Sequence, residues 1–168
     1  MRVEPIGFAR SSIGRGFGYP ARMRGRVLAL DLGVRRIGLA VSDLEQSLAF
    51  PAGHLERVAI QRDLEALHAL ARERGIARIV VGLPLHLDGG DGDAAHSARE
   101  FACSLARETS LPVDLLDERW TTREAERALR EGPRKRRRRK GEVDALAATL
   151  LLQSWLARAG GPAEGLEA

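Results

Sequence analysis

A continuous apolar run near residue 30 restricts the fold of this chain more than any other feature. The run VLAL covers residues 27–30 and ends on a carboxylate, Asp31. A strand that is apolar at every position, and not only at alternate ones, is typical of the centre of a sheet that is covered on both faces. The rest of the chain must therefore supply helices for those faces, and Asp31 places a charge at the end of a strand that should be dry.

A hairpin is expected around this run. Residues 35–42 alternate between branched apolar and small side chains, which predicts a second strand next to residues 26–31. Gly33 provides backbone freedom for the turn between the two strands. A third strand is expected at 48–55, at an edge of the sheet or irregular, because Pro51 has no N–H group to donate.

Strands and helices alternate in the remainder of the chain. The expected strands are 79–83 and 113–117, and the expected helices are 59–74, 93–109, one that begins at Thr121 or Thr122, and one at about 142–157. The fold class is therefore α/β, with a mixed five-stranded sheet flanked by helices. In that sheet a three-strand meander is followed by a β-α-β-α succession.

The 168 residues fit one domain, and an apolar fraction of 44% is enough for a core. Residues 1–24 are rich in Gly and Arg without periodicity, so we expect a flexible N-terminal extension. The folded domain should cover 25–158, and 159–168 should be a disordered tail. The single cysteine, Cys103, excludes an internal disulfide. With no signal-peptide pattern and no run long enough for a bilayer, we expect a cytoplasmic protein without membrane contact.

Carboxylates occur at the ends of three core elements. Asp31 ends the first strand, Asp117 ends the strand 113–117 and Glu118 directly follows it, and Asp144 starts the apolar stripe of the last helix. Each has an ordinary structural explanation, such as a turn or the helix dipole. Together they would repel one another unless cations were bound, and oxygen ligands suit Mg²⁺ or Mn²⁺. Alternation on a strand allows only one of Asp117 and Glu118 to reach such a site, and spacing does not decide which.

Four segments of the sequence resemble the YqgF/RuvX family, which are ribonuclease-H-like proteins described as Holliday junction resolvases and as nucleases that mature the precursor of 16S ribosomal RNA. The segments are ALDLGVRRIGLAVSD (29–43), VVGLPLHLDGGDG (80–92), LLDERWTTREAE (115–126) and RRKGEVDALAATLLLQSWL (138–156). The resemblance implies that Asp31, Glu118 and Asp144 are catalytic acids that bind Mg²⁺ or Mn²⁺, as two ions. It also implies that Asp31 lies on the central strand.

Departures from the family pattern are few. His86 stands where the family pattern has an Asn, and residues 1–24 match no family segment. Asp43 and Asp88, which are inside the quoted segments, could approach the site, but a turn role is favoured for both.

A basic run precedes the last helix. It consists of seven consecutive cations, Arg134, Lys135, Arg136, Arg137, Arg138, Arg139 and Lys140. Such a run repels itself and is expected to be a mobile loop until a polyanion neutralises it. We therefore expect these residues to bind nucleic-acid phosphates next to Asp144, with little reading of base sequence.

These patterns favour a metal-dependent endonuclease that acts on structured RNA or branched DNA, as a monomer or a homodimer. One alternative is a nucleic-acid-binding ribosome-assembly factor that keeps the fold without catalysis. Another is a nucleotide-binding domain of the actin-like type, in which a similar hairpin faces phosphates. That class uses two such domains, and 168 residues have room for one.

Overall fold

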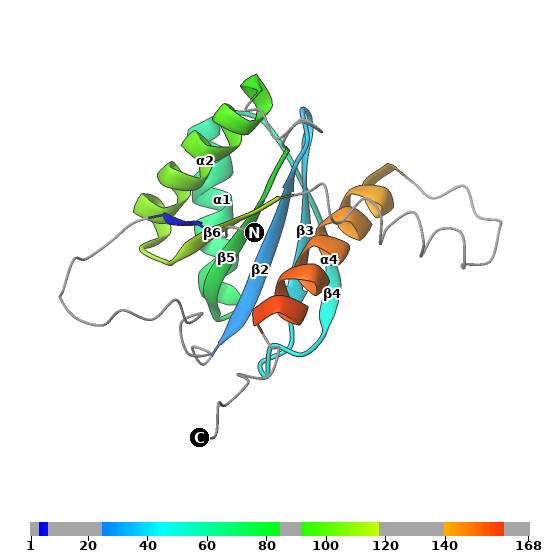
Figure 1. Cartoon of the computed structure of the whole chain (residues 1–168). Helices are drawn as coiled ribbons and strands as arrows, with labels where there is room; N and C mark the ends of the chain where they lie inside the picture. The colour runs from blue at the N-terminus through cyan, green and yellow to red at the C-terminus, as the bar shows by residue number, and fades with distance from the viewer. Residues whose placement is uncertain (1–3, 7–24, 85–91, 118–139, 160–168) are drawn as a thin grey trace, which may run out of the picture.

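The computed structural model describes residues 4–6, 25–84, 92–117 and 140–159. Figure 1 shows one twisted sheet with helices on both sides. The elements are β1 (Glu4–Ile6), β2 (Arg26–Leu32), β3 (Arg36–Ser42), β4 (Ala49–Glu56), α1 (Ile60–Glu73), β5 (Ile76–Leu83), α2 (Asp93–Thr109), β6 (Val113–Asp117) and α4 (Lys140–Ala159).

The sheet has the strand order β1-β6-β5-β2-β3-β4. The strands β2, β3 and β4 form an antiparallel meander, and β5 and β6 lie parallel to β2 on its other side. The predicted mixed sheet is therefore confirmed for its five expected strands, with Pro51 in an edge strand, and β1 adds a sixth. Because β2, β5 and β6 run in one direction, their carboxyl ends meet at one edge of the sheet. We call it the carboxyl edge.

Two apolar layers hold the helices to the sheet. One face, the α1/α2 face, packs side chains such as Leu28, Leu30 and Val81 against α1 and α2. The opposite face, the α4 face, packs Val27 and Ala29 against the stripe of α4 formed by Ala148, Leu151, Leu152 and Trp155. Figure 1 shows α1 and α2 on one side of β2 and α4 on the other. The expected stripe of the last helix therefore does contact the sheet.

The N-terminal segment contributes a strand that the sequence pattern missed. Glu4–Ile6 forms β1, which pairs antiparallel with β6. Three residues are too few to show periodicity, and Pro5 opposes strand structure except at an edge, which is where β1 lies. The other residues of 1–24 lie outside the described part of the chain, as do residues 160–168.

The last helix begins earlier than its apolar stripe. It starts at Lys140, so the final cation of the basic run belongs to α4 and not to a loop. Lysine is a good helix former, and the stripe that marks the buried face only begins one turn later.

A buried ion pair fastens the far end of α4. The guanidinium of Arg78 on β5 donates through Nη1 to both carboxylate oxygens of Asp114 on β6, at 2.8 Å each. The indole Nε1 of Trp155 donates to the same carboxylate at 3.2 Å. Arg78 and Asp114 are 8% and 5% exposed. The C-terminal half of α4 is thereby tied to the first halves of β5 and β6.

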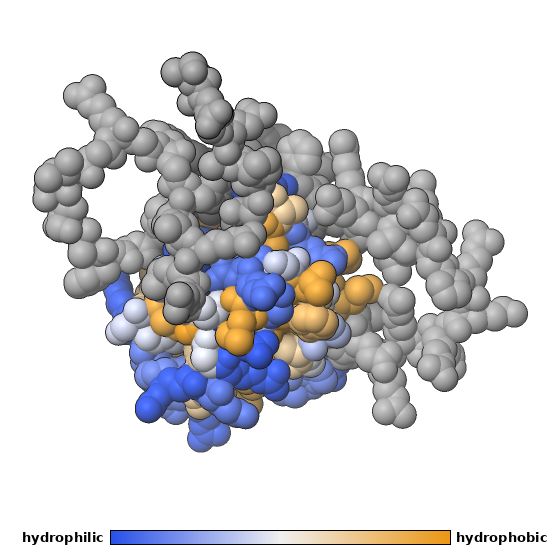
Figure 2. Space-filling view, turned by 90° about the horizontal axis from the view of Figure 1, so that it is seen from below, coloured by the Kyte–Doolittle hydropathy of each residue, from blue (hydrophilic) through white to orange (hydrophobic). Residues whose placement is uncertain are grey.

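The connection between β3 and β4 lies at the end of the sheet opposite the carboxyl edge. Figure 2 looks at the molecule from that side, where the coloured surface is mainly hydrophilic with separate apolar patches. Asp43 organises the connection, because its Oδ1 accepts hydrogen bonds from the backbone N–H groups of Ser47, at 2.7 Å, and Leu48, at 3.0 Å. The favoured turn role of Asp43 is confirmed, and β3 carries it away from Asp31.

These bonds predict a pH-dependent contribution to stability. The backbone hydrogen bonds from Leu48 and Ser47 lower the pKa of the Asp43 carboxyl below its ordinary value of 3.8. A carboxyl whose pKa is lower in the folded state than in the unfolded state stabilises the fold when the pH is above its unfolded-state pKa. This stabilisation is lost as the pH falls through the folded-state pKa. Asp43→Asn should therefore lower the melting temperature at pH 7, and the difference from wild type should shrink below about pH 4. A difference that is constant between pH 7 and pH 3 would contradict this role.

Candidate active site

The register of the parallel strands places Asp31 on the α4 face of the sheet. Leu30 pairs with Val81, which pairs with Leu115, so Asp31 shares the next row with Gly82 and Leu116. Side chains alternate along a strand, and Ala29 and Leu116 both pack on the α4 face. Asp31 therefore lies on that face, half-buried, next to the position where Gly82 has no side chain.

Strand alternation also decides which way Asp117 points. Leu116 packs on the α4 face and Leu115 packs on the α1/α2 face, so Asp117 belongs to the α1/α2 face. Asp117 is buried there and pairs in register with Leu83. It therefore lies on the opposite side of the sheet from Asp31. Glu118 is the next residue in the sequence and lies outside the described residues.

The direction of α4 brings Asp144 toward the same edge. Trp155, near the end of the helix, contacts Asp114 in the first half of β6. The helix therefore runs antiparallel to β6 and β2, and its first turns point toward the carboxyl edge, as Figure 1 shows for the end of α4 that starts at Lys140. The backbone of Asp144 lies in those first turns, four residues before Ala148. The structure does not describe its side chain.

A tight turn follows Asp31. The N–H group of Gly33 donates to the carbonyl oxygen of Arg36 at 2.8 Å and also to that of Asp31 at 3.2 Å. A Cβ atom on Gly33 would lie 2.7 Å from the Arg36 carbonyl oxygen, which no side chain tolerates without a backbone shift. The glycine is therefore needed for this close approach. The backbone freedom expected from the sequence is not the reason, because Gly33 is not among the residues with a positive φ angle.

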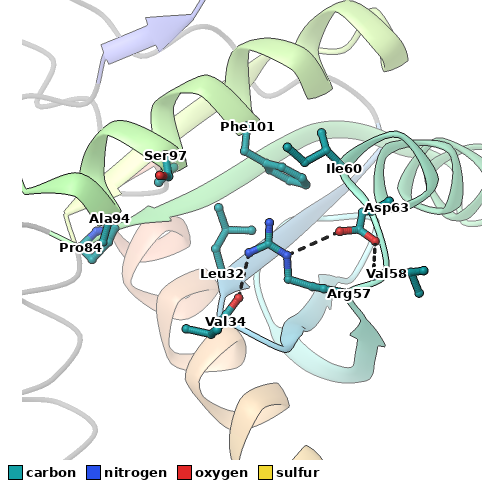
Figure 3. Close-up of a pocket in the computed structure, with 13 residues that line it drawn as sticks. Leu32, Val34, Arg57, Val58, Ile60, Asp63, Pro84, Ala94, Ser97 and Phe101 are labelled. Atoms are coloured by element: carbon teal, nitrogen blue, oxygen red, sulfur yellow. Dashed lines mark hydrogen bonds and ion pairs between the residues drawn. The ribbon is translucent and has the colours of Figure 1, made fainter.

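A pocket of about 520 Å³ opens on the α1/α2 face at the carboxyl edge. Leu32 and Gly33, the two residues after Asp31, form part of its wall, and α1 and α2 supply much of the remainder (Figure 3). The pocket and Asp31 therefore lie on opposite faces at the end of the same strand.

Arg57 joins three elements around this pocket. Its Nη1 donates to the carbonyl oxygen of Gly33 at 2.9 Å, and its Nε lies 3.5 Å from Oδ2 of Asp63 on α1. Its guanidinium carbon lies 5.7 Å from the centre of the Phe101 ring on α2. Asp63, only 3% exposed, also accepts from the N–H group of Val58 at 3.1 Å. These contacts fasten the turn after Asp31 to both helices.

The sequence analysis missed Arg57 and Asp63. In the sequence Asp63 is an acid in the first turn of a helix, where acids commonly complement the dipole. Arg57 stands in a short connection, and no motif around it marks it in the sequence. No spacing rule links either residue to the Asp31 motif, so only the folded chain brings them together.

Two of the predicted site features, Glu118 and the basic run up to residue 139, lie outside the described residues. The same holds for His86 and Asp88, to which the sequence assigned no site role. Among the described side chains, no group of three or more His, Cys, Asp or Glu lies close enough to hold a metal ion. No described helix has the length and hydropathy to cross a bilayer.

Comparison with known families gives a match over most of the chain. The model of the RuvX family, described as "Holliday junction resolvase", matches residues 25–158. A protein of Koribacter versatilis (strain Ellin345) named "Putative pre-16S rRNA nuclease" is 47% identical over 141 residues, which cover 84% of this chain and 92% of that protein. A protein of the same name from Anaeromyxobacter sp. (strain Fw109-5) is 47% identical over 131 residues, covering 78% of this chain and 96% of the relative.

A solved structure shares the architecture. It is that of T. thermophilus RuvC in complex with a Holliday junction substrate, with a TM-score of 0.55 and 18% sequence identity. The match covers 82% of this chain and 97% of the other. At this identity the likeness concerns the fold, which is the ribonuclease-H-like fold expected from the sequence.

Proposed function

Because the chain belongs to the RuvX family of Holliday junction resolvases, we propose that it is a metal-dependent endonuclease that hydrolyses phosphodiester bonds in structured nucleic acid. One observation carries the proposal. Asp31 is a half-buried carboxylate at the carboxyl end of the central strand, on the face that α4 covers, and the first turns of α4 bring Asp144 toward that end. This strand is hydrogen-bonded to a neighbour on each side and therefore gives such a group a firm support.

The acids fit a divalent cation. Asp31, Glu118 and Asp144 offer carboxylate oxygens, the ligands that Mg²⁺ and Mn²⁺ prefer, and like charges at one place need a counter-charge. We infer that these residues hold two such ions. When bound there, the ions would supply Lewis-acid chemistry for phosphodiester hydrolysis, namely activation of water and stabilisation of the charge on the leaving oxygen. Of the three acids, Asp31 lies on β2, which is fixed on both sides by neighbouring strands.

Asp117 is not assigned to the proposed metal site. It lies on the α1/α2 face, so Glu118 is the acid of this segment that we assign to the site. The assignment follows the family resemblance and agrees with strand alternation, since neighbouring residues of an extended chain face opposite ways.

The natural substrate is a structured nucleic acid. The relatives named above carry the name of a pre-16S rRNA nuclease, and the family description names Holliday junctions. We propose precursor 16S ribosomal RNA as the first substrate to test and the four-way DNA junction as the second. A symmetric homodimer would serve two cuts in a junction, whereas a monomer suffices for one cut in an RNA strand.

The basic run leads directly into α4. Arg134, Lys135, Arg136, Arg137, Arg138, Arg139 and Lys140 are proposed to bind backbone phosphates, and Lys140 is the first residue of the helix that carries Asp144. Phosphates held at the start of α4 would lie next to the acids. Such contacts position a strand without reading its sequence.

This role predicts a change in salt dependence. Each arginine on a duplex phosphate contributes about −0.9 to the slope of log K against log salt. If two of the four side chains Arg136, Arg137, Arg138 and Arg139 touch phosphates, changing all four to Ser should flatten the slope by about 2. Affinity at low salt should fall at least about tenfold, and cleavage should recover at saturating substrate. An unchanged slope in fluorescence-anisotropy titrations would remove the run from the interface.

The function itself is tested by a parallel cleavage assay. The purified chain with Mg²⁺ is incubated with precursor RNA, a four-way junction and a linear duplex of matched length. We expect cleavage of at least one structured substrate, its loss in EDTA, and weaker cleavage of the linear duplex. Binding without cleavage of any substrate would favour the alternative, a ribosome-assembly factor with the same fold.

A further inference from the structure

The pocket on the α1/α2 face has an unusual apolar rim. The described chain exposes six large apolar side chains, and three of them, Val34, Val58 and Ile60, line this one pocket. Their exposed fractions are 94%, 70% and 61%. The walls behind them include Leu32 and Phe101. Apolar side chains that are exposed around a pocket favour a ligand with a flat, largely apolar surface.

The polar groups of the pocket are few and balanced in charge. Among the described lining residues, Arg57 and Asp63 are the charged ones, and they pair with each other. In Figure 3 the third nitrogen of the Arg57 guanidinium points toward Leu32 and Phe101, inside the pocket. With an acid beside the arginine, the described lining has no net positive charge. It therefore suits a neutral ligand with hydrogen-bond acceptors better than a free phosphate.

The position of the pocket connects it to the proposed chemistry. Asp31 and Leu32 are consecutive on β2, with Cα atoms about 3.8 Å apart, and they point to opposite faces. A nucleic-acid strand whose phosphate lies beside Asp31 can therefore turn its base around the end of β2 toward the pocket. Such a base must be unpaired, because a base inside a duplex cannot reach a pocket.

We propose that this pocket binds one unpaired nucleobase of the substrate, next to the phosphate that is cut. The inference rests on the proposed nuclease function and adds a recognition site to it. Arg57 provides a planar guanidinium that is backed by Phe101, a kind of surface on which unstacked bases pack. Leu32, Val58 and Ile60 enclose the base, and the hydroxyl of Ser97 lines the pocket on α2 (Figure 3).

The test compares oligonucleotides that differ at one unpaired position. One carries a normal base and the other an abasic residue, and the position is moved stepwise along the strand. Binding to the full chain is measured by fluorescence anisotropy without divalent metal, so that the readout does not depend on cleavage. At one position the abasic residue should weaken binding about tenfold, as expected for the loss of one stacked base.

Filling the pocket should have the same effect as removing the base. Ser97 is exposed on α2 and lines the pocket. Ser97→Trp should therefore weaken binding of the base-containing oligonucleotide about tenfold and leave binding of the abasic one unchanged. The matched control is His96→Trp, at an exposed neighbouring position that does not line the pocket. Ala94→Trp, at another exposed lining position, repeats the test in case the first variant does not fold.

The results separate this inference from the proposed function. Equal binding of the base-containing and abasic oligonucleotides at every position, or unchanged discrimination in Ser97→Trp and Ala94→Trp, would overturn the nucleobase site even if cleavage is normal. A chain that discriminates as expected but cleaves nothing in Mg²⁺ would keep the site and overturn the nuclease.

Discussion

Changing Asp31 to Asn is expected to abolish cleavage and to leave the fold intact. The same result is expected for Glu118→Gln and Asp144→Asn. Each change removes a proposed anionic ligand while keeping nearly the same size, and metal-ion stabilisation of a phosphodiester transition state is worth several kcal/mol. At about 1.36 kcal/mol for each factor of ten, the loss of cleavage rate should be about a thousandfold or more. The rate is measured at saturating substrate, with circular dichroism to check the fold.

Asp117→Asn is the matched control for these variants. Asp117 lies directly before Glu118 but on the opposite face of the sheet from Asp31. It should therefore keep cleavage, per mole of folded protein, close to that of wild type. Loss of cleavage in Asp117→Asn together with normal cleavage in Glu118→Gln would reverse the assignment of the second acid.

Of all the substitutions proposed for this chain, removal of the Asp114 carboxylate is expected to lower the free energy of unfolding the most. Asp114→Ala leaves the guanidinium of Arg78 buried without its anion and takes the acceptor from the Trp155 indole. The loss of one partner of a buried ion pair typically costs about 3–5 kcal/mol. Urea unfolding followed by far-ultraviolet circular dichroism should show a loss in this range.

A double variant tests the cause. Arg78→Met with Asp114→Leu removes both charges, so a large part of the lost stability should return, because an apolar pair often replaces a buried ion pair at little cost. The control is Glu56→Ala, which breaks the exposed pair between Arg36 and Glu56 and should change stability little. If Asp114→Ala unfolds at the same urea concentration as Glu56→Ala, the buried network does not stabilise α4 on the sheet.

The sequence is sufficient to predict the structure where the local hydrophobic pattern and the rules of sheet topology favour the same arrangement. The apolar run 27–30 predicts a central strand, and β2 is central because β3 and β5 pair on its two sides. Right-handed crossovers between parallel strands leave few other arrangements for the helices. The place of Asp31 at the carboxyl edge follows from this order. It could therefore be predicted without knowledge of any contact.

Other features depend on pairing that no local pattern reveals. Arg78 interrupts the apolar pattern of β5, so the strand seemed to begin at 79, whereas it begins at Ile76. Its charge is tolerated because Asp114, distant in the sequence, lies beside it. The face of the sheet on which Asp117 lies likewise follows only from how Leu115 and Leu116 pack, whereas the preference for Glu118 came from the family resemblance.

The pocket beside Asp31 is a further case. It is built from the turn after β2, the start of α1 and the start of α2, which are brought together by Arg57 and its contacts with Gly33 and Asp63. Each of these residues has an ordinary local explanation in the sequence. Their common position next to the proposed metal site is a property of the folded chain.

The most direct test of metal binding by Asp31 is the metal preference of cleavage by Asp31→Cys. A thiolate is a poor ligand for Mg²⁺ and a good one for softer cations. We predict that Asp31→Cys loses cleavage in Mg²⁺, and that its cleavage rate rises at least about tenfold when Mn²⁺ or Cd²⁺ is supplied instead. Asp43→Cys, with the same change at the opposite edge of the sheet, should keep the wild-type preference for Mg²⁺. Cleavage by Asp31→Cys in Mg²⁺ at the wild-type rate would contradict a metal-binding role for Asp31.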